Sequence, residues 1–446
     1  MIGAETPRRI AVVGAGVSGL VAAAELVRAG HDVRVFEAGP YAGGHTNTID
    51  VETPGGRWPV DTGFIVFNDR NYPNFERLIG ELRVPSQPAN MSFSVSDGRG
   101  EFEWATRGPR GLFARPGHVV DRRFHRMLRD LLRFNREARF LVGTGTAGPS
   151  LREFLADGGY SEYFVERLLV PQASAVWSAD PEQLWAFPAG FLAQFFEQHG
   201  VLQLLGRPAW RTITGGSRRY VEALIAPFRN QVHLRSPVRS ILRDEEQVTL
   251  LLDDSDPSFD EVVIATHSDQ ALKLLEQPRQ AERVILGAIP YQRNEAVLHS
   301  DASVMPRRRS AWASWNYHLT GEPTGRTTVT YDLNRLQSLG ADRDLLVTLN
   351  RTEAIDPSQV VRVIDYSHPV FTPDGVEAQT HWDSISGVGR THYCGAYWRW
   401  GFHEDGVWSA LRVARALGGR GPVELPDRVQ APAAVEPRKP ELVEAA

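Results

Sequence analysis

Three glycines near the N-terminus have the spacing of a dinucleotide-binding turn. Gly14, Gly16 and Gly19 follow the apolar run Arg9–Val13, which predicts a strand, and precede the helical stretch Leu20–Arg28. In such a strand–turn–helix unit, the first glycine makes the tight turn and the second lets the backbone approach a pyrophosphate. The third lets the helix pack on the strand, and the helix N-terminus faces the phosphates. The contact residues predicted here are Gly14, Ala15, Gly16, Val17, Ser18 and Gly19.

This glycine spacing alone is a weak signal. With 40 glycines in 446 residues, roughly 0.3 accidental matches are expected. A second match, from Gly143 to Gly148, follows a helical stretch and runs directly into Pro149. It lacks the strand–turn–helix context, so we interpret it as a loop. Only the N-terminal match has the context that dinucleotide binding requires.

A carboxylate and a second pair of glycines narrow the choice of dinucleotide. Glu37 ends the predicted strand Val33–Phe36, where a carboxylate accepts hydrogen bonds from ribose hydroxyls and repels the 2′-phosphate of NADP. The following glycine pair lets the backbone pass close to the pyrophosphate and ribitol of FAD, which NAD dehydrogenases do not need. Two ordinary turns are the alternative interpretation. The contacts predicted here are Glu37, Gly43, Gly44, His45, Asp61 and Gly63.

The elements that would position these residues are spread along the chain. Thr46–Val51 and Trp58–Val60 flank the turn sequence Pro54-Gly55-Gly56 and predict a hairpin. Helical, aromatic-rich sequence follows, with a capping box that begins at Ser150. Later segments again have the pattern of strands, and a helix is expected at the end: Val232–Leu234, Val238–Arg243, Gln247–Leu252, Glu261–Ala265, Ala311–Tyr317, Thr327–Tyr331, Arg390–Ala396 and the helix Val407–Leu417.

Several segments together carry a resemblance to a known family. They are Val12–Leu20, Glu37–His45, Asp61–Asn68, Gly215–Ser217, Phe259–His267, Cys394–Trp398 and Gly401–Val407. The chain resembles the FAD-dependent amine oxidase and phytoene desaturase superfamily, and within it a bacterial branch of predicted NAD/FAD-binding oxidoreductases. The resemblance extends to about residue 419. It implies FAD as the cofactor.

The resemblance implies an α/β fold with a discontinuous Rossmann-like FAD-binding domain and an inserted, mixed α+β substrate domain. The FAD-binding domain would comprise residues 1–85, 206–270 and 385–420. The substrate or cap domain would comprise residues 86–205 and 271–384. Residues 421–446 are rich in Pro, Glu and Ala and predict a disordered tail.

The resemblance also implies further cofactor contacts. The backbone of Val238 would meet the adenine, and Thr266 would lie where the chain crosses the pyrophosphate. Gly395 closes the last strand. Gly406 and Val407 would open the final helix, whose N-terminus would face the flavin O2 region and stabilise negative charge there.

Two departures from the family pattern concern charged residues. Ala396 follows Gly395 where amine oxidases commonly have a carboxylate; either Glu404 or Asp405 replaces it, or Asp405 only caps the final helix. The chain has just two lysines, Lys273 and Lys439, and neither lies in the Trp-rich strands. Many amine oxidases hold a water at flavin N5 with a lysine from those strands. A typical amine oxidase is therefore less favoured than the fold alone suggests.

No residue is assigned as the catalytic acid or base, and no metal site is predicted. Candidate histidines are His45, His267, His318 and His403, although each is more simply a structural histidine. The aromatic residues that line a pocket or fill the core are Trp312, Trp315, Tyr317, Tyr397, Trp398 and Trp400. Cys394 lies in a predicted buried strand, and we interpret it as a packing residue.

The composition of the chain indicates its cellular compartment and argues against one class of partner. A net charge of −5 and a pI near 6.2 argue against nucleic acid as a partner. The single cysteine fits a reducing compartment, and neither a signal peptide nor an 18-residue apolar run occurs, so we expect a cytoplasmic protein.

One basic segment departs from this acidic balance. Between residues 99 and 139, 11 arginines face 5 acidic residues. Apolar residues recur there at helical spacing: Val120, Phe124, Met127, Leu128, Leu131 and Leu132. Residues 118–140 are therefore predicted to contact an anionic membrane peripherally. The alternative is a core-facing helix with a solvated basic face.

These features favour an FAD-dependent oxidoreductase that transfers hydride between a small hydrophobic substrate, lipid or acyl-chain-like, and flavin N5. One alternative is a flavin amine oxidase. The other is a flavin-bearing electron-transfer partner of a lipid-modifying enzyme.

Overall fold

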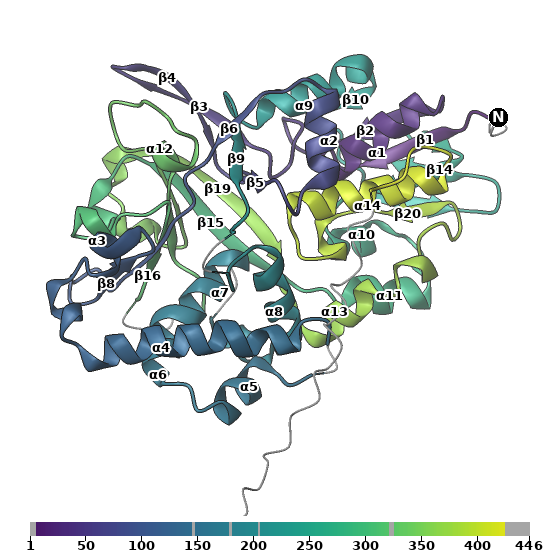
Figure 1. Ribbon diagram of the computed structural model, residues 1–446. Coiled ribbons are helices and arrows are strands. Elements are labelled where there is room, and N and C mark those ends of the chain that lie inside the picture. The colour runs from purple at the N-terminus through teal and green to yellow at the C-terminus, as the bar shows by residue number, and fades with distance from the viewer. Residues whose placement is uncertain (1–5, 145–147, 178–180, 204–205, 321–324, 424–446) are drawn as a thin grey trace, which may run out of the picture.

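The computed structural model describes residues 6–144, 148–177, 181–203, 206–320 and 325–423. Figure 1 shows a parallel sheet with its helices beside a larger mixed sheet that is covered by a helical layer. The predicted α/β fold class is confirmed. Most of the predicted tail, residues 424–446, lies outside the described residues, and so does the middle of the second glycine match, residues 145–147.

A five-stranded parallel sheet is assembled from three distant parts of the chain. Its strand order is β10-β2-β1-β14-β20. In that order the strands are Val232–His233, Asp32–Phe36, Arg9–Val13, Glu261–Ile264 and Thr391–Tyr393. The central strands are apolar on both faces, as expected where helices cover a parallel sheet.

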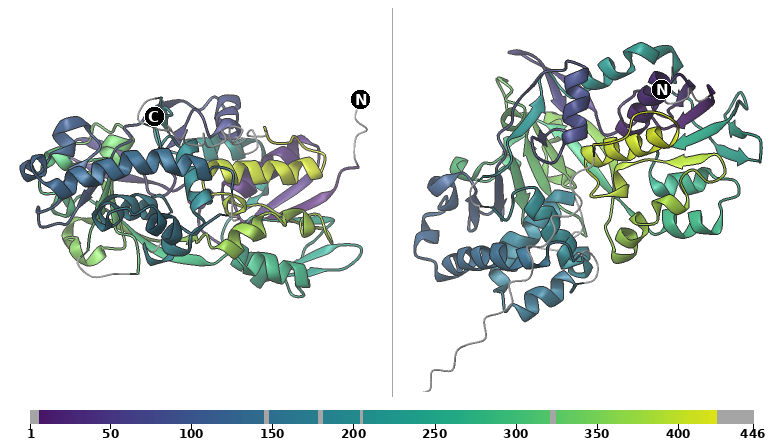
Figure 2. Two further views of the ribbon diagram at one scale, coloured as in Figure 1. Left: turned by 60° about the horizontal axis from the view of Figure 1, so that its bottom comes forward. Right: turned by 45° about the vertical axis from the view of Figure 1, so that its right-hand side comes forward.

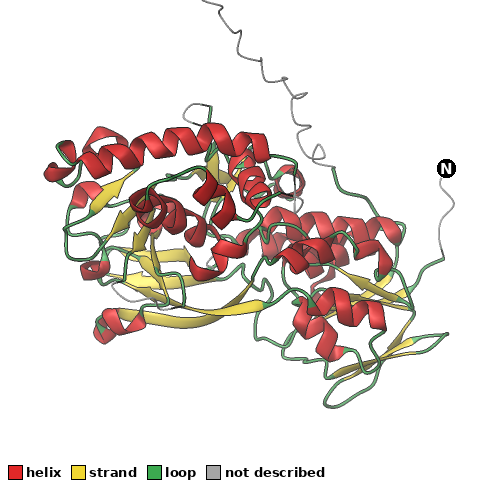
Figure 3. Cartoon of the chain, turned by 90° about the horizontal axis from the view of Figure 1, so that it is seen from below, coloured by secondary structure: helices red, strands yellow, loops and turns green. Residues whose placement is uncertain are grey.

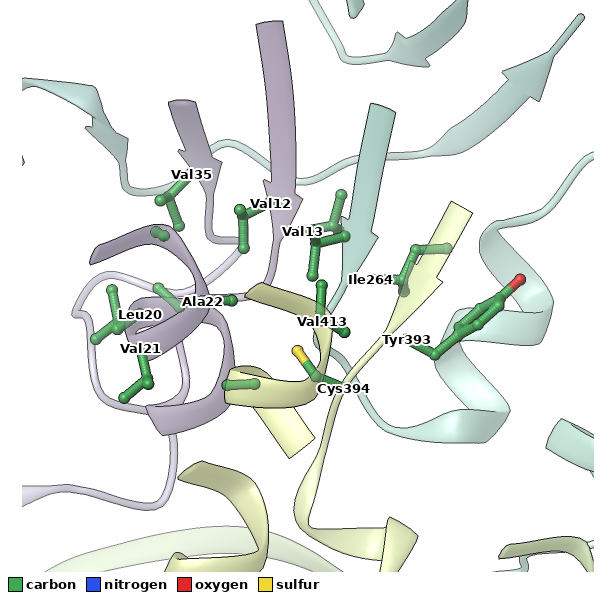
Figure 4. Packing of buried hydrophobic residues seen from close by; sticks show 14 of the residues in the cluster. Val12, Val13, Leu20, Val21, Ala22, Val35, Ile264, Tyr393, Cys394 and Val413 are labelled. Atoms are coloured by element: carbon green, nitrogen blue, oxygen red, sulfur yellow. The ribbon is translucent and has the colours of Figure 1, made fainter. Parts of the chain in front are cut away.

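Two helices pack together against this sheet, α1 (Val17–Arg28) and α14 (His403–Ala416). Figure 4 shows Leu20, Val21 and Ala22 of α1 and Val413 of α14 beside the strand residues Val12 and Ile264. Cys394 is fully buried in the same cluster. This confirms its interpretation as a packing residue.

Shorter elements complete this half of the molecule. A three-stranded antiparallel sheet has the order β11-β12-β13. Its strands are Ser240–Arg243, Val248–Leu251 and Ser258–Phe259. The helices are α2 (Pro73–Glu81), α9 (Arg218–Ile225), α10 (Ser268–Leu274), α11 (Gln280–Gly287) and α13 (Pro373–Gln379).

A seven-stranded mixed sheet forms the other half, in the order β19-β15-β18-β17-β16-β7-β8. Only the pair β16–β7 is parallel. In sheet order the strands are Val360–Pro369, Tyr291–His299, Leu346–Leu349, Val329–Asp332, Trp315–His318, Phe93–Ser96 and Glu103–Ala105. The short helix α12 (Leu333–Leu336) follows β17.

Helices gather on one side of the seven-stranded sheet (Figure 3). They are α3 (Gly108–Leu112), α4 (Arg122–Glu137), α5 (Leu151–Asp157), α6 (Glu162–Phe164), α7 (Val170–Trp177) and α8 (Ala189–Gln198). The capping box predicted at Ser150 is present. The Ser150 hydroxyl accepts a hydrogen bond from Glu153 N–H, and the Glu153 carboxylate accepts one from Ser150 N–H. Within the part of the chain that the structure describes, no helix is long and apolar enough to cross a membrane.

Two small sheets connect the halves. The predicted hairpin is formed by β3 (Thr48–Thr53) and β4 (Gly56–Asp61). The other sheet has the order β5-β9-β6, with strands Phe67–Asn68, Trp210–Ile213 and Ser86–Pro88.

Several predicted boundaries differ from those in the structure. The strand predicted at Ala311–Tyr317 begins only at Trp315, because Arg309–Ala311 form a short 3-10 helix. The final helix begins at His403 rather than Val407. The Asp405 carboxylate accepts a hydrogen bond from Phe402 N–H at 2.8 Å, and the Gly406 N–H already donates to the Phe402 carbonyl. Asp405 therefore lies in the first turn of the helix and not before it.

Candidate functional site

A cavity of about 1060 Å³ lies where four strands of the parallel sheet end. Its wall includes residues that follow β1, β2, β14 and β20: Gly14, Glu37, Thr266 and Gly395. The carboxyl ends of parallel strands are the usual ligand-binding edge of an open α/β sheet. Much of the remaining wall comes from the mixed sheet and from α7 and α8, and residues of α10 and of the start of α14 also contribute.

The glycine turn has the geometry that its sequence predicts. Gly14 has φ +100°, and a Cβ there would lie 3.0 Å from the Ala265 carbonyl oxygen. A Cβ on Gly19 would lie 2.0 Å from the Gly14 carbonyl oxygen, so this glycine permits the close packing of α1. A Cβ on Gly16 would have no neighbour within 4 Å. Gly16 therefore opens the wall to a ligand.

The second glycine pair lies against the first. Gly43 and Gly44 have φ +132° and +58°, and Gly43 N–H donates to the Ala15 carbonyl at 2.7 Å. A Cβ on Gly44 would lie 3.1 Å from Gly16 Cα. The two motifs thus form one stretch of wall without side chains, where a ligand can approach the backbone closely.

The Glu37 carboxylate is fixed by backbone amides. It accepts hydrogen bonds from Ala15 N–H at 2.8 Å and Gly39 N–H at 2.7 Å. Each carboxylate oxygen has two lone pairs, so both retain acceptor capacity toward a hydroxyl group. Because Glu37 lies on the cavity wall, it can accept from ribose hydroxyls there.

The structure places most of the predicted cofactor contacts on this wall. Besides the residues above, they are Val17, Ser18, His45, Gly63, Val238 and Thr266. Five predicted residues lie behind it: Ala15, Gly19, Asp61, Gly406 and Val407. A Cβ on Gly406 would lie 2.9 Å from both Ser18 Oγ and Val17 Cγ1. Gly406 therefore allows α14 to approach α1, while Phe402 and His403 face the cavity at the start of α14.

Asp61 connects elements instead of lining the cavity. Its buried carboxylate accepts hydrogen bonds from Thr48 Oγ1 at 2.6 Å and from Ser217 N–H at 2.9 Å. Burial raises the pKa of Asp61 to about 6, although these hydrogen bonds act to lower it. It ties the hairpin β3–β4 to the start of α9.

Neither Glu404 nor Asp405 reaches the cavity. Glu404 accepts hydrogen bonds from the N–H groups of Asn74 and Phe75, in the first turn of α2. Burial raises the pKa of Glu404 to about 7 and that of Asp405 to about 6. Both carboxylates are used inside the protein, so neither replaces the one absent after Gly395.

Histidines and tyrosines converge beside the glycine-lined wall. The His45 ring lies 4.7 Å from the Tyr366 ring and 5.3 Å from the His368 ring, and the His267 ring stacks on Tyr291 at 4.5 Å. Burial lowers the pKa of His45, His267 and His368, the last to about 4. All three are neutral at pH 7. Among the described residues, no group of three His, Cys, Asp or Glu side chains is placed to hold a metal ion.

A chain of amides fixes the orientation of His368. Asn350 Nδ2 donates to Asn294 Oδ1 at 2.7 Å and to the Thr327 carbonyl at 2.9 Å. Asn294 Nδ2 in turn lies 2.8 Å from His368 Nδ1. An amide nitrogen only donates, so Nδ1 accepts and the proton of the neutral ring is on Nε2. His368, on the cavity wall, therefore has an N–H to offer.

Aromatic and aliphatic side chains form the other end of the cavity. Of the predicted aromatic candidates, Trp315, Tyr397 and Trp400 line it, whereas Trp312, Tyr317 and Trp398 do not. His318 is also away from the wall, bonded through Nε2 to Thr330 Oγ1 at 2.7 Å. The apolar wall residues that the sequence did not single out include Phe93, Val176, Trp177, Phe195, Trp210 and Phe371.

Comparison with known proteins settles the family. Residues 17–294, more than half of the chain, match the family described as "Flavin containing amine oxidoreductase". The chain belongs to this family. The membership confirms the predicted superfamily, FAD as the cofactor and the broad class of FAD-dependent oxidoreductase.

Individual relatives of this family member are distant. An L-amino acid oxidase of Bothrops pictus is 22% identical over 307 residues, 61% of this chain and 55% of the relative. The chain thus spans about half the length of that relative. Cyclohexylamine oxidase from Brevibacterium oxydans IH-35A has a TM-score of 0.66 at 18% identity, covering 93% and 99% of the two chains. A fatty acid isomerase from P. acnes that produces CLA has a TM-score of 0.66 at 16% identity, with the same coverage. These structures share the fold.

The residues present fit FAD. A cradle without Cβ atoms at Gly16, a fixed acceptor at Glu37 and the start of α14 at the same wall are what a dinucleotide requires. When bound, FAD supplies hydride chemistry at its ring.

Glu404 gives the stability of the apoprotein a specific pH dependence. Its pKa is about 7 when folded and near 4.5 when unfolded. The folded protein therefore binds this proton more tightly. The stabilisation is complete below about pH 4.5 and is lost as the pH rises through 7, by roughly 3 kcal/mol. The free energy of unfolding, measured by denaturant melts across this pH range, should lose this pH dependence in Glu404→Gln. The exposed control Glu353→Gln should retain it. The same dependence of unfolding free energy on pH in both variants would show that Glu404 is not its source.

Proposed function

We propose that the chain oxidises or reduces an apolar, acyl-chain-like molecule by hydride transfer to or from flavin N5. The observation that carries this proposal is the apolar end of the cavity. This end is lined by Trp177, Phe195, Phe371 and Val176. Its wall is continuous with the glycine-lined wall at Gly16 and Gly44. Ligand pockets are usually about 300–1,000 Å³. A cavity of about 1060 Å³ suits a dinucleotide and a substrate together.

The charges on the wall support an apolar substrate over an amine. Among the described residues that line the cavity, Glu37 is the only carboxylate, and it is fixed on Ala15 and Gly39. The cationic residues Arg207 and Lys273 also lie on the wall. A protonated amine would lack a counter-charge among these described wall residues, and burying an unpaired charge is costly. An amine oxidase is thus the weaker candidate.

His368 supplies a polar group to this otherwise apolar space. Strands β15 and β19 contain no lysine. The cavity wall includes His368 of β19, whose ring is hydrogen-bonded to Asn294 of β15. The neutral ring of His368 keeps a proton at Nε2, where it donates a hydrogen bond or transfers a proton as the substrate changes charge. The amide chain from Asn350 holds this tautomer.

The fold relatives include enzymes of both candidate classes, a cyclohexylamine oxidase and a fatty acid isomerase. The third candidate, an electron-transfer partner without its own substrate, would need no cavity beyond the cofactor. The apolar end argues against it. The substrate that we propose is therefore lipid-like.

Organic extraction of the purified holoprotein tests the substrate class. We expect acyl or isoprenoid lipid to be extracted together with the flavin. We also expect this lipid to reduce the protein-bound flavin, and so bleach its colour, under anaerobic conditions. Val176→Glu should keep the flavin but lose the lipid, because it puts a charge on the apolar wall. Val361→Glu, at a valine that is 42% exposed on β19, is the matched control. Flavin reduction by amines but not by lipids would overturn the proposal.

A further inference from the structure

The outer face of α4 is an arginine stripe. Arg122, Arg126, Arg129, Arg133 and Arg136 are spaced by three or four residues. At about 100° per residue, they fall within roughly 80° of one another around the helix. The opposite face is buried through Phe124, Met127 and Phe134. In the left view of Figure 2 this long helix lies across the side of the molecule that is turned forward.

Exposed apolar side chains bracket the stripe. Val120 is 81% exposed and Phe140 is 80% exposed, more than any other large apolar side chain among the described residues. Val119 and Leu132 are also more than half exposed, at 57% and 53%. The apolar residues that the sequence places at helical spacing therefore do not share one buried face, because Val120 and Leu132 are exposed while Phe124 and Met127 are buried.

The positive charge of this surface is only partly neutralised within the protein. Residues 119–141 contain 7 arginines and 3 acidic residues, in a chain whose net charge is −5. Salt bridges at this surface, among the described residues, involve four of the arginines: Arg126, Arg133, Arg136 and Arg139. Within the described ranges, the exposed side chains of Arg122, Arg123 and Arg129 form none. A basic stripe beside exposed apolar groups is complementary to an anionic lipid surface, which offers both phosphates and an apolar layer.

The same surface is joined to the cavity wall. Arg139 donates to the Leu202 carbonyl at 3.0 Å and to the Glu197 carboxylate at 3.1 Å, at the end of α8. The neighbouring residues His199, Gly200 and Val201 line the cavity. A lipid surface seated on α4 would therefore adjoin the apolar end of the cavity.

We propose that α4, with Val119, Val120 and Phe140, docks the protein on an anionic bilayer surface and brings the 199–201 wall beside the lipid that supplies the substrate. The supply of substrate from the bilayer rests on the proposed function. The docking of α4 on the bilayer does not, since it concerns binding alone.

Flotation of the full-length holoprotein with vesicles tests the docking. We expect binding to phosphatidylcholine vesicles that contain phosphatidylglycerol, little binding to pure phosphatidylcholine, and loss of binding in high salt. Arg122→Glu with Arg129→Glu should weaken binding at least about 30-fold, from about 1 kcal/mol for each basic residue. Val120→Asp with Phe140→Asp should also weaken it, because the apolar insertion is lost.

The matched control changes an exposed arginine and valine elsewhere, Arg283→Glu with Val284→Asp on α11. It should bind vesicles like the unaltered protein. Equal binding to both vesicle types, or unchanged binding by the two α4 variants, would overturn the proposal. The proposal would also be overturned if the protein bound duplex DNA more tightly than vesicles and if Val120→Asp with Phe140→Asp left that binding unchanged. That result would identify a nucleic-acid surface. Vesicle binding without lipid oxidation would instead refute only the proposed function.

Discussion

Replacing Gly16 with valine is expected to weaken FAD binding at least about 100-fold while the protein still folds. The backbone of Gly16 has φ −71° and ψ 177°, which valine adopts readily. A Cβ there meets no protein atom within 4 Å, so the added side chain occupies only the cavity. It would stand where the backbone must approach the pyrophosphate. A 100-fold loss corresponds to about 2.7 kcal/mol.

The measurement is FAD affinity by titration of the apoprotein, together with its circular dichroism. Gly80→Val is the matched control, because Gly80 is exposed in α2 and a Cβ there would also have no neighbour within 4 Å. It should keep normal affinity. Gly14→Val is less informative, since φ +100° makes any side chain there strained. A Gly16→Val protein that holds stoichiometric FAD would show that the cradle is not the cofactor site.

Replacing His368 with leucine is expected to slow anaerobic flavin reduction by substrate about 100-fold without loss of flavin. General acid–base groups typically contribute about 10²–10⁴-fold, and His368 Nε2–H is held on the cavity wall by Asn294. His368→Asn keeps an N–H donor and should recover part of the rate. Asn294→Leu should give an intermediate rate, because the ring loses the partner that fixes its tautomer.

The substrate for this test is the lipid that extraction identifies. The control is His381→Leu, at a histidine that follows α13 and whose side chain is 54% exposed. An unaltered rate in His368→Leu would remove this histidine from the chemistry. A loss of flavin in that variant would assign it to cofactor binding.

Local sequence patterns predict the conformation of the glycine-lined half of the candidate site. Gly14, Gly16, Gly19 and Glu37 lie within one strand–turn–helix–strand unit, and short-range geometry determines their positions. The sequence predicts the start of α14 four residues late because Asp405 has the chemistry of a cap both before a helix and inside its first turn.

The substrate half is not predictable in the same way. His368 is positioned by Asn294 and Asn350, which are far from it in sequence, and nothing in its local sequence indicates this. Trp177 and Phe195 lie on α7 and α8, whose apolar residues fit a core equally well. Val120 and Leu132 fit a helical repeat with Phe124, yet tertiary packing leaves them exposed. Long-range pairing decides these positions.

We infer that this chain holds FAD and uses it for redox chemistry on an apolar molecule. The most direct test is the visible absorption spectrum of the purified protein, followed by extraction of its cofactor and any lipid. We predict flavin bands, release of FAD in about equal amount to protein, and co-extracted lipid. A colourless protein that does not take up added FAD would contradict this inference.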